Sequence, residues 1–154
     1  MEGGRRLEAT SHVTKLVTNS KVHKEPIVIV DGGALRPRPN EGYMSVNWLE
    51  YDGDNDLKTC LQKIILILEK KLNVKDNHWL PVINVKKAID RIKTGTSDNR
   101  LMQFLYKPEF KPDFKWDDPS HSGVYGYSHS HEDALIGDLM AEVVEPLHKA
   151  KDYK

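Results

Sequence analysis

Residues 57–72 read LKTCLQKIILILEKKL, and this stretch predicts an amphipathic helix that must pack against another layer of the protein. Apolar side chains recur at intervals of three and four residues, which places them along one side of a helix. These positions are Leu57, Leu61, Ile64, Ile65, Leu68 and Leu72. Asp54 or Asn55 is predicted to cap the helix, because a side-chain oxygen there can accept a hydrogen bond from a free helical N–H group. A helix with one apolar side needs a partner surface, and the flanking sequence supplies candidates for a sheet.

Four other stretches predict strands. Residues 26–30 form a β-branched run that ends at the turn signal Asp31-Gly32-Gly33, and residues 79–83 and 101–106 are short apolar runs. Residues 44–51 alternate with period two, so that Met44, Val46 and Trp48 face one way. Ser45, Asn47 and Leu49 then face the opposite way. The residues from Lys107 to Pro119 contain three prolines and are predicted to form a loop.

Two further helices are predicted. The first begins after Asn84 as its cap, buries a face that includes Ala88 and Ile92, and ends at Gly95. The second begins near Ser130, with an acid three residues later, and ends before Pro146. Its buried stripe is predicted to consist of Leu135 or Ile136 followed by Leu139, Met140, Val143 and Val144.

These elements predict an α+β fold, with a small mixed or antiparallel sheet packed against two or three helices. The length of 154 residues fits a single domain. Residues 1–24 are mostly polar, and we expect them to form a flexible N-terminal arm or to hold one edge strand. Residues 25–154 are expected to form the domain itself.

The composition limits the classes of function. Lys and Arg total 23, as do Asp and Glu, so the chain has no global basic field for nucleic acid or an anionic membrane. Balanced charge is compatible with a homo-oligomer. Cys60 is the only cysteine, which excludes an intrachain disulfide and a thiolate zinc cluster. The longest apolar run has five residues and the N-terminus lacks an apolar signal region, so we expect a soluble cytoplasmic protein.

Residues 117–133 read DDPSHSGVYGYSHSHED and contain three of the seven histidines. His121, His129 and His131, with Glu132 or Asp133, supply nitrogen and oxygen ligands that suit a divalent metal such as zinc or manganese. In a metal-dependent hydrolase or nuclease, an acid could then act as general base on a metal-bound water. The alternative is that these polar residues cap the following helix and cover a surface loop. The pattern matches no diagnostic metal-ligand spacing.

A second alternative is nucleic-acid binding through basic side chains. The candidates are Arg36, Arg38, Lys86, Lys87 and Arg91. A basic patch with a neighbouring aromatic ring could bind phosphates and stack a base. Because acids are equally numerous, a solvated mixed surface explains the same residues.

Other catalytic patterns fail on spacing. The acids from Asp52 to Asp56 lack the glycine and glutamate that a calcium-binding EF-hand loop needs at its sixth and twelfth positions. The chain contains no G-x-S-x-G elbow, so it gives no support for a serine hydrolase of that type. Asp117 and Asp118 are adjacent and are expected to point apart.

Three aromatic residues in predicted loop sequence, Trp116, Tyr125 and Tyr127, favour protein docking, because exposed aromatics anchor interfaces. The leading prediction is therefore a small cytosolic binding or accessory module without a cofactor. It would dock a protein partner in a multi-protein system, and we do not predict it to be an enzyme.

Two segments carry a resemblance. Residues 45–50 (SVNWLE) and 118–126 (DPSHSGVYG) are similar to segments of short bacterial proteins to which no activity is attached. The two segments together hold 15 of the 154 residues. The resemblance implies a bacterial cytosolic setting and no particular reaction. For the multi-protein system of the leading prediction, the candidates are bacterial defence and mobile-element systems.

Overall fold

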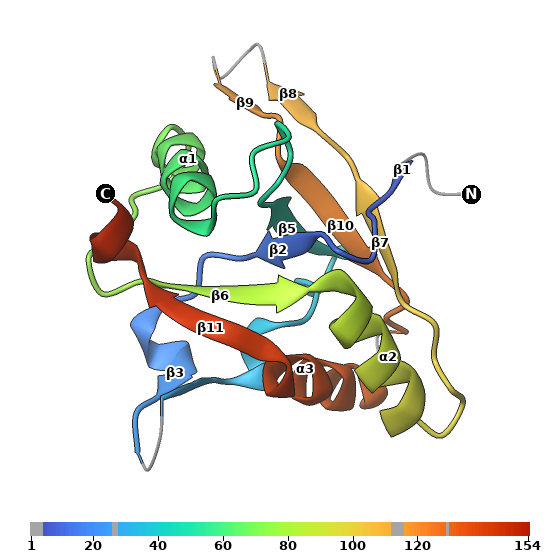
Figure 1. The fold of residues 1–154 in the computed structure, drawn as a ribbon. Coiled ribbons are helices and arrows are strands. Elements are labelled where there is room, and N and C mark those ends of the chain that lie inside the picture. Colours follow the sequence, from blue (N-terminus) through green and yellow to red (C-terminus); the bar gives the residue numbers. More distant parts are fainter. Residues whose placement is uncertain (1–4, 26–27, 112–115, 129) are drawn as a thin grey trace.

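The computed structural model describes residues 5–25, 28–111, 116–128 and 130–154. Within them the chain has the predicted α+β fold, built around a seven-stranded sheet whose neighbouring strands are all antiparallel (Figure 1). The strand order is β1-β7-β10-β5-β2-β6-β11. The strands are β1 (Arg5–Arg6), β2 (His12–Thr14), β5 (Met44–Trp48), β6 (Trp79–Asn84), β7 (Gln103–Tyr106), β10 (His121–Tyr125) and β11 (Val144–Lys149).

Three helices cover the sheet, and short elements join the layers. The helices are α1 (Leu57–Glu69), α2 (Val85–Gly95) and α3 (Glu132–Glu142). Two small hairpins pair β3 (Val22–His23) with β4 (Ile29–Val30), and β8 (Glu109–Lys111) with β9 (Trp116–Asp118). Short 3₁₀ turns form at η1 (Asn19–Lys21), η2 (Gly32–Ala34) and η4 (Ala150–Tyr153). No helix in the described ranges is both long and apolar enough to cross a membrane.

Local signals explain α1 and α2. The buried side of α1 includes Leu61, Ile64 and Leu68, as its periodicity predicts. Its cap is Asp56, one or two residues later than predicted, and the Asp56 carboxylate accepts hydrogen bonds from the Thr59 N–H and hydroxyl. The α2 helix begins at the predicted cap, where the Asn84 side chain accepts a hydrogen bond from Lys87 N–H at 2.9 Å, and it ends at Gly95.

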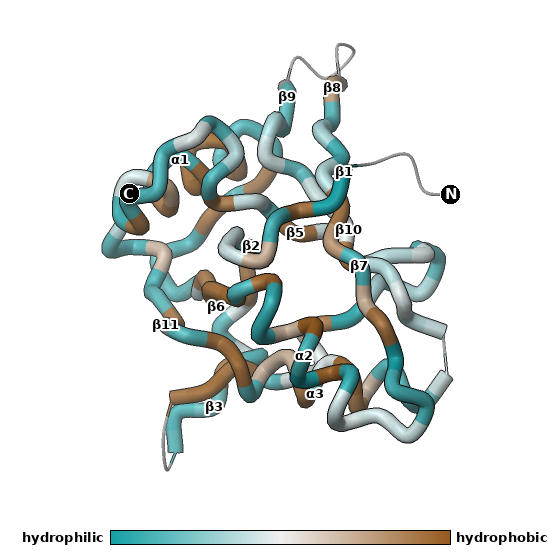
Figure 2. The backbone as a smooth tube through the Cα atoms, turned by 45° about the vertical axis from the view of Figure 1, so that its right-hand side comes forward, coloured by the Kyte–Doolittle hydropathy of each residue, from teal (hydrophilic) through white to brown (hydrophobic). Residues whose placement is uncertain are grey.

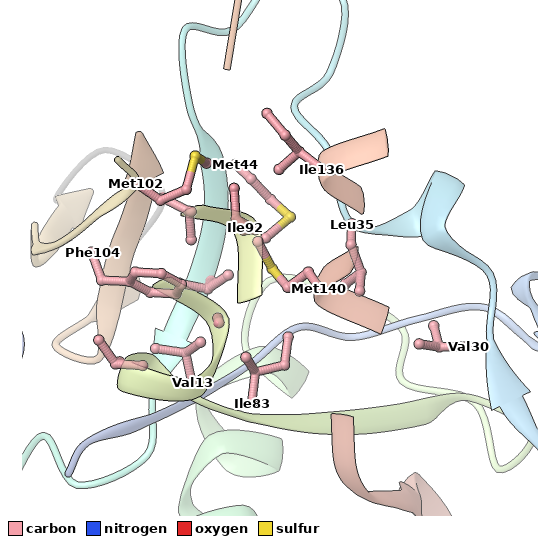
Figure 3. Packing of buried hydrophobic residues seen from close by; sticks show 14 of the residues in the cluster. Val13, Val30, Leu35, Met44, Ile83, Ile92, Met102, Phe104, Ile136 and Met140 are labelled. Carbon is pink, nitrogen blue, oxygen red and sulfur yellow. The ribbon is translucent and has the colours of Figure 1, made fainter. Parts of the chain in front are cut away.

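The alternating pattern of the inner strands divides the core in two. In β6, Ile83 packs into a cluster with α2 and α3, whereas Leu80 and Val82 pack into a second cluster with α1. Figure 3 shows Met44 of β5 meeting Ile92 of α2 and Met140 of α3 in the first cluster. In Figure 2, hydrophobic stretches run through the middle layer, whereas the projecting β8–β9 hairpin is mostly hydrophilic.

The prediction for the N-terminus is corrected in part. Residues 5–6 form β1, an edge strand as the alternative prediction allows, but residues 12–14 form β2, which lies inside the sheet between β5 and β6. Val13 is fully buried there. A strand of only three residues is too short to show an alternating pattern, so its position depends on the neighbours that pair with it.

Two more predictions are corrected in the C-terminal half. The histidine-bearing segment is not a surface loop between residues 121 and 125: it is β10, an inner strand buried along its length. The predicted loop from Lys107 to Pro119 contains the β8–β9 hairpin. The last helix ends at Glu142, before Pro146 as predicted but short of the predicted stripe positions Val143 and Val144. Pro146 lies in β11, where the strand register shifts.

The α3 helix lies unusually close to the η2 turn because glycines face each other across the contact. A Cβ atom at Gly137 would lie 2.3 Å from the carbonyl oxygen of Gly32, and one at Gly32 would lie 2.7 Å from the Asp138 backbone nitrogen. The backbone on both sides leaves no room for a methyl group. This contact positions the chain that leads from η2 to Arg36 and Arg38.

We predict that Gly137→Ala destabilises the protein by about 1–3 kcal/mol, because overpacking against backbone outweighs the helix propensity of alanine. Urea unfolding measures the difference. Gly42→Ala is the matched control, since no atom lies within 4 Å of the added Cβ. A Gly137→Ala variant as stable as the Gly42→Ala variant would contradict the close contact.

Candidate functional site

A polar cleft of about 380 Å³ opens beside β5 and β10 and reaches the C-terminal end of α1. We call it the β5–β10 cleft. Its charged and polar lining comprises Lys15, Arg36, Arg38, Glu41, Tyr43, Ser45, Asn47, Lys71, Glu109, Asp118 and His121. The alternation of β5 explains the polar wall, because Ser45 and Asn47 face away from the cluster that holds Met44 and Val46.

Asp118 is the most buried charged group of the cleft, with 0% of its side chain exposed. Lys71 Nζ donates to its Oδ2 at 2.8 Å, and Asn47 Nδ2 donates to the same oxygen at 3.0 Å. Its Oδ1 accepts the Ser120 hydroxyl at 2.7 Å and the Ser120 N–H at 3.1 Å. Burial alone would raise the pKa of this carboxyl, but the hydrogen bonds from Lys71 and Ser120 outweigh it and lower the pKa below 3.8. Asp118 is therefore a charged structural anchor.

His121 is held by both ring nitrogens. Its Nδ1 lies 2.7 Å from the carbonyl oxygen of Lys107, which can only accept, so Nδ1 carries a proton. In the neutral ring, Nε2 is then an acceptor, and the Ser45 hydroxyl lies 3.2 Å away. The Glu109 Oε1 atom is 3.6 Å from the same Nε2. The Ser45 hydroxyl therefore lies next to a base, the His121 imidazole, and the Lys107 carbonyl oxygen holds that imidazole in place.

Aromatic rings support this histidine. Tyr43 and Tyr125 stack with ring centroids 5.0 Å apart, and His121 meets Tyr43 edge-on at 6.2 Å. Lys107 Nζ lies over both tyrosine rings and donates to the Tyr125 hydroxyl at 2.7 Å. Gly123 leaves room for the stack, because a Cβ there would lie 2.8 Å from each ring.

Three further cations, Lys15, Arg36 and Arg38, line the cleft. Burial and the nearby Arg38 guanidinium lower the pKa of Lys15 from 10.5 to about 8, although Glu41 opposes this shift. Lys15 Nζ donates to the carbonyl oxygen of Ala34 at 2.9 Å. Within the part of the chain that the structure describes, no ion pair involves Arg36 or Arg38. The cleft thus contains two arginines that form no ion pair with its described acids.

A second hollow, of about 680 Å³, lies near Trp48 and the start of α1. Some of its charges are already engaged: the Glu50 carboxylate accepts from both the backbone N–H and the ring of His12, and Arg5 lies over Trp48. Burial raises the pKa of Cys60, which lines this hollow, to about 11, so its thiol stays protonated near neutral pH. The β5–β10 cleft is therefore the better candidate site.

The described histidines of the metal prediction do not lie together. His121 is buried in β10, His131 is exposed at the start of α3, and His129 lies outside the described residues. Among the residues with described placement, no group of three or more His, Cys, Asp or Glu side chains converges on a metal position. Asp133 accepts a hydrogen bond from Ser128 N–H, and Glu132 pairs with Arg100. Metal binding stays a prediction.

The five basic candidates divide into two groups. Arg36 and Arg38 line the β5–β10 cleft, whereas the basic residues of α2 do not. On α2, Lys86 pairs with Asp90, Lys87 with Glu145 and Arg91 with Glu142. Nucleic-acid binding across all five residues stays a prediction. Arg36 and Arg38 belong instead to the lining of the β5–β10 cleft.

Two of the three aromatic residues predicted to anchor a protein partner, Tyr125 and Tyr127, are not exposed side chains. Tyr125 is only 9% exposed, and the hydroxyl of the half-buried Tyr127 donates to the Leu35 carbonyl oxygen at 3.0 Å. Burial raises the pKa of Tyr127. Trp116 lies in β9, and its side chain falls outside the described residues. Among described side chains the exposed aromatic is Phe110, at 66%, on the partner strand β8.

Sequence reasoning singled out His121, Arg36 and Arg38, but for separate hypotheses. It missed Lys15, Ser45 and Lys71 as parts of one site. The available signal was the alternation of residues 44–51, which placed Ser45 and Asn47 on one face of a strand. Comparisons with protein-family models, curated proteins and solved structures find no match. The resemblance to short bacterial proteins therefore stays an expectation.

We predict that Asp118→Asn lowers the free energy of unfolding by about 3 kcal/mol at pH 7, because it removes a buried charge that accepts hydrogen bonds from Lys71, Asn47 and Ser120. The folded-state pKa of Asp118 is lowered, so its stabilisation is complete above the ordinary value of 3.8 and is lost as the pH falls through the lowered value. Urea unfolding between pH 3 and pH 7 should show the difference shrinking in acid. Asp117→Asn, an exposed neighbour, should change stability little.

We predict the opposite sign for Lys15→Met, which should raise the free energy of unfolding at pH 7 by about 1–3 kcal/mol. The pKa of Lys15 is about 8 in the folded state and 10.5 in the unfolded chain. Below pH 8 the amine is charged in both states, and the folded state bears the full cost of burying that charge. The gain should therefore shrink as the pH rises from 8 to 10.5. Thermal unfolding tests this against Lys58→Met on the exposed side of α1. A destabilised Lys15→Met variant would contradict the desolvation argument.

Proposed function

We propose that this protein is a binding module whose β5–β10 cleft takes a small ligand carrying a carboxylate or phosphate group. The observation that carries the proposal is the pair Arg36 and Arg38, which line the cleft and form no ion pair with any described residue. A guanidinium presents parallel N–H donors that match two oxygens of a carboxylate or phosphate.

The other charges of the cleft favour one orientation of the ligand. Asp118 is neutralised by Lys71 and saturated by hydrogen bonds, so it competes little for the arginines. Lys15 adds a third cation next to Arg38. Glu109 lies instead beside His121, which makes that end of the cleft unfavourable for an anion. The anionic group is therefore expected near Arg36 and Arg38, with the rest of the ligand extending towards Ser45.

The loop that carries the arginines supports this function. Pro37 and Pro39 fix their own φ angles and restrict the residues that precede them, which include both arginines. A restricted loop loses less conformational entropy when it binds a ligand. The η2 turn that precedes the loop is itself held against α3 by the Gly32–Gly137 contact.

A binding role agrees with the prediction made from the sequence, but the ligand differs. Docking of a protein partner through Trp116, Tyr125 and Tyr127 stays a prediction. The burial of Tyr125 and the hydrogen bond of Tyr127 favour structural roles for those two residues. A cytoplasmic location and a bacterial multi-protein setting also stay proposals.

We predict that isothermal titration with adipate and with inorganic phosphate gives saturable binding to the intact chain. Arg36→Ala and Arg38→Ala should each weaken adipate binding about 10- to 100-fold, the range for a hydrogen bond to a charged group. Lys87→Ala, whose amine pairs with Glu145 outside the cleft, is the matched control. Adipate affinity should also fall between pH 7 and pH 9, as Lys15 loses its proton with a pKa of about 8. Unchanged affinity in both arginine variants would refute the proposal.

A further inference from the structure

The Ser45 hydroxyl is positioned as a nucleophile next to a base. It lies 3.2 Å from Nε2 of His121, within the range for a hydrogen bond between a nucleophile and its base. Ser45 is partly exposed and lines the cleft, so a ligand can reach it. The strand register places Ser45 opposite Gly123, which has no side chain to cover the hydroxyl.

The surroundings of His121 fix its role. The Lys107 carbonyl oxygen holds the Nδ1–H, which leaves Nε2 as the acceptor that faces Ser45. A carbonyl oxygen or carboxylate at Nδ1 orients a catalytic imidazole and selects its tautomer. The Glu109 carboxylate, 3.6 Å from Nε2, lies close enough to stabilise the imidazolium that forms when His121 accepts a proton.

We infer that Ser45 and His121 form a nucleophile–base pair that hydrolyses a carboxylic ester whose acyl part carries a second, anionic group. The inference rests on the proposed function, because Arg36 and Arg38 would hold that anionic group while the ester carbonyl reaches Ser45. An ester carbonyl is uncharged, so it tolerates the carboxylate of Glu109 near His121 better than a phosphoryl group would.

The reaction balances with water as the only co-reactant. Ser45 Oγ forms a bond to the carbonyl carbon as its proton moves to His121 Nε2. The bond from that carbon to the alcohol oxygen breaks, and the alcohol leaves with the proton from Nε2. Water then gives a proton to Nε2 and its oxygen attacks the acyl group, after which the carbon–Oγ bond breaks and Ser45 recovers its proton. This chemistry does not need the strand-to-helix elbow that the sequence lacks.

An alkyl fluorophosphonate tests the nucleophile directly, because it reacts covalently with activated serines. Mass spectrometry of the intact labelled chain should locate the adduct on Ser45. Ser45→Ala should abolish the adduct, and His121→Gln should slow its formation about 100-fold or more. Ser122→Ala is the matched control: this buried hydroxyl lies on the neighbouring strand and bonds to the Ser120 carbonyl oxygen. Adipate titration of each variant shows that the cleft is still folded.

Ester hydrolysis tests the substrate class. The 4-nitrophenyl monoester of adipic acid should be cleaved with a kcat/KM at least about 10-fold above that of 4-nitrophenyl hexanoate, which lacks the carboxylate. Arg36→Ala should remove this preference, because the arginine that binds the carboxylate is gone.

The two proposals fail separately. If Ser45 is not labelled while adipate still binds, the nucleophile assignment is wrong and the binding function stands. If Ser45 is labelled but the arginine variants neither lose adipate nor change the ester preference, the anionic substrate class is wrong. Labelling of Ser45 that does not depend on His121 would overturn the nucleophile–base pair.

Discussion

The carboxylate of Asp118 is removed from water and remains charged, and the arrangement of the cleft depends on how that charge is balanced. Burying an isolated carboxylate costs several kcal/mol, so its partners must stay in place. Those partners come from different parts of the chain: Lys71 follows α1, Asn47 belongs to β5, and Ser120 lies in the turn before β10. Keeping the charge satisfied therefore fixes one end of a helix against two strands. Ser45 and His121 stand on those same two strands.

Unlike Asp118, the cations Arg36, Arg38 and Lys15 of the cleft are not balanced by ion pairs with described residues. Asp118 has nearly all of its acceptor positions filled, whereas Arg36 and Arg38 have no ion pair with any described side chain. Lys15 is held where burial disfavours its charge. A cation whose charge is disfavoured by burial reduces stability, and groups with strongly perturbed pKa values are concentrated at functional sites. The contrast separates the residues that build the cleft from those that act in it.

The sequence predicted the elements whose signals are local. The stripe of α1, the Asn84 cap of α2, the alternation of β5 and the apolar run of β6 all depend on residues within one segment. It could not predict β2 or β10, because three residues show no period and a Ser-His-Ser-Gly run is typical of loops. Both are strands because of the neighbours that pair with them. The pair of Ser45 and His121 spans 76 residues, and no local pattern indicates that β5 and β10 are adjacent.

Register explains why these two residues meet. In the pairing of β10 with β5, His121 lies opposite Asn47 and Gly123 lies opposite Ser45, so the histidine reaches the serine diagonally. The diagonal is open because Gly123 adds no side chain between them, and the same glycine admits the Tyr43–Tyr125 stack that borders the imidazole. A slip of one residue would turn His121 into the core and bring Ser122 to the cleft. The hydrophobic side of the strand, where Val124 packs with Met102 and Phe104, therefore also decides which polar residues face the ligand.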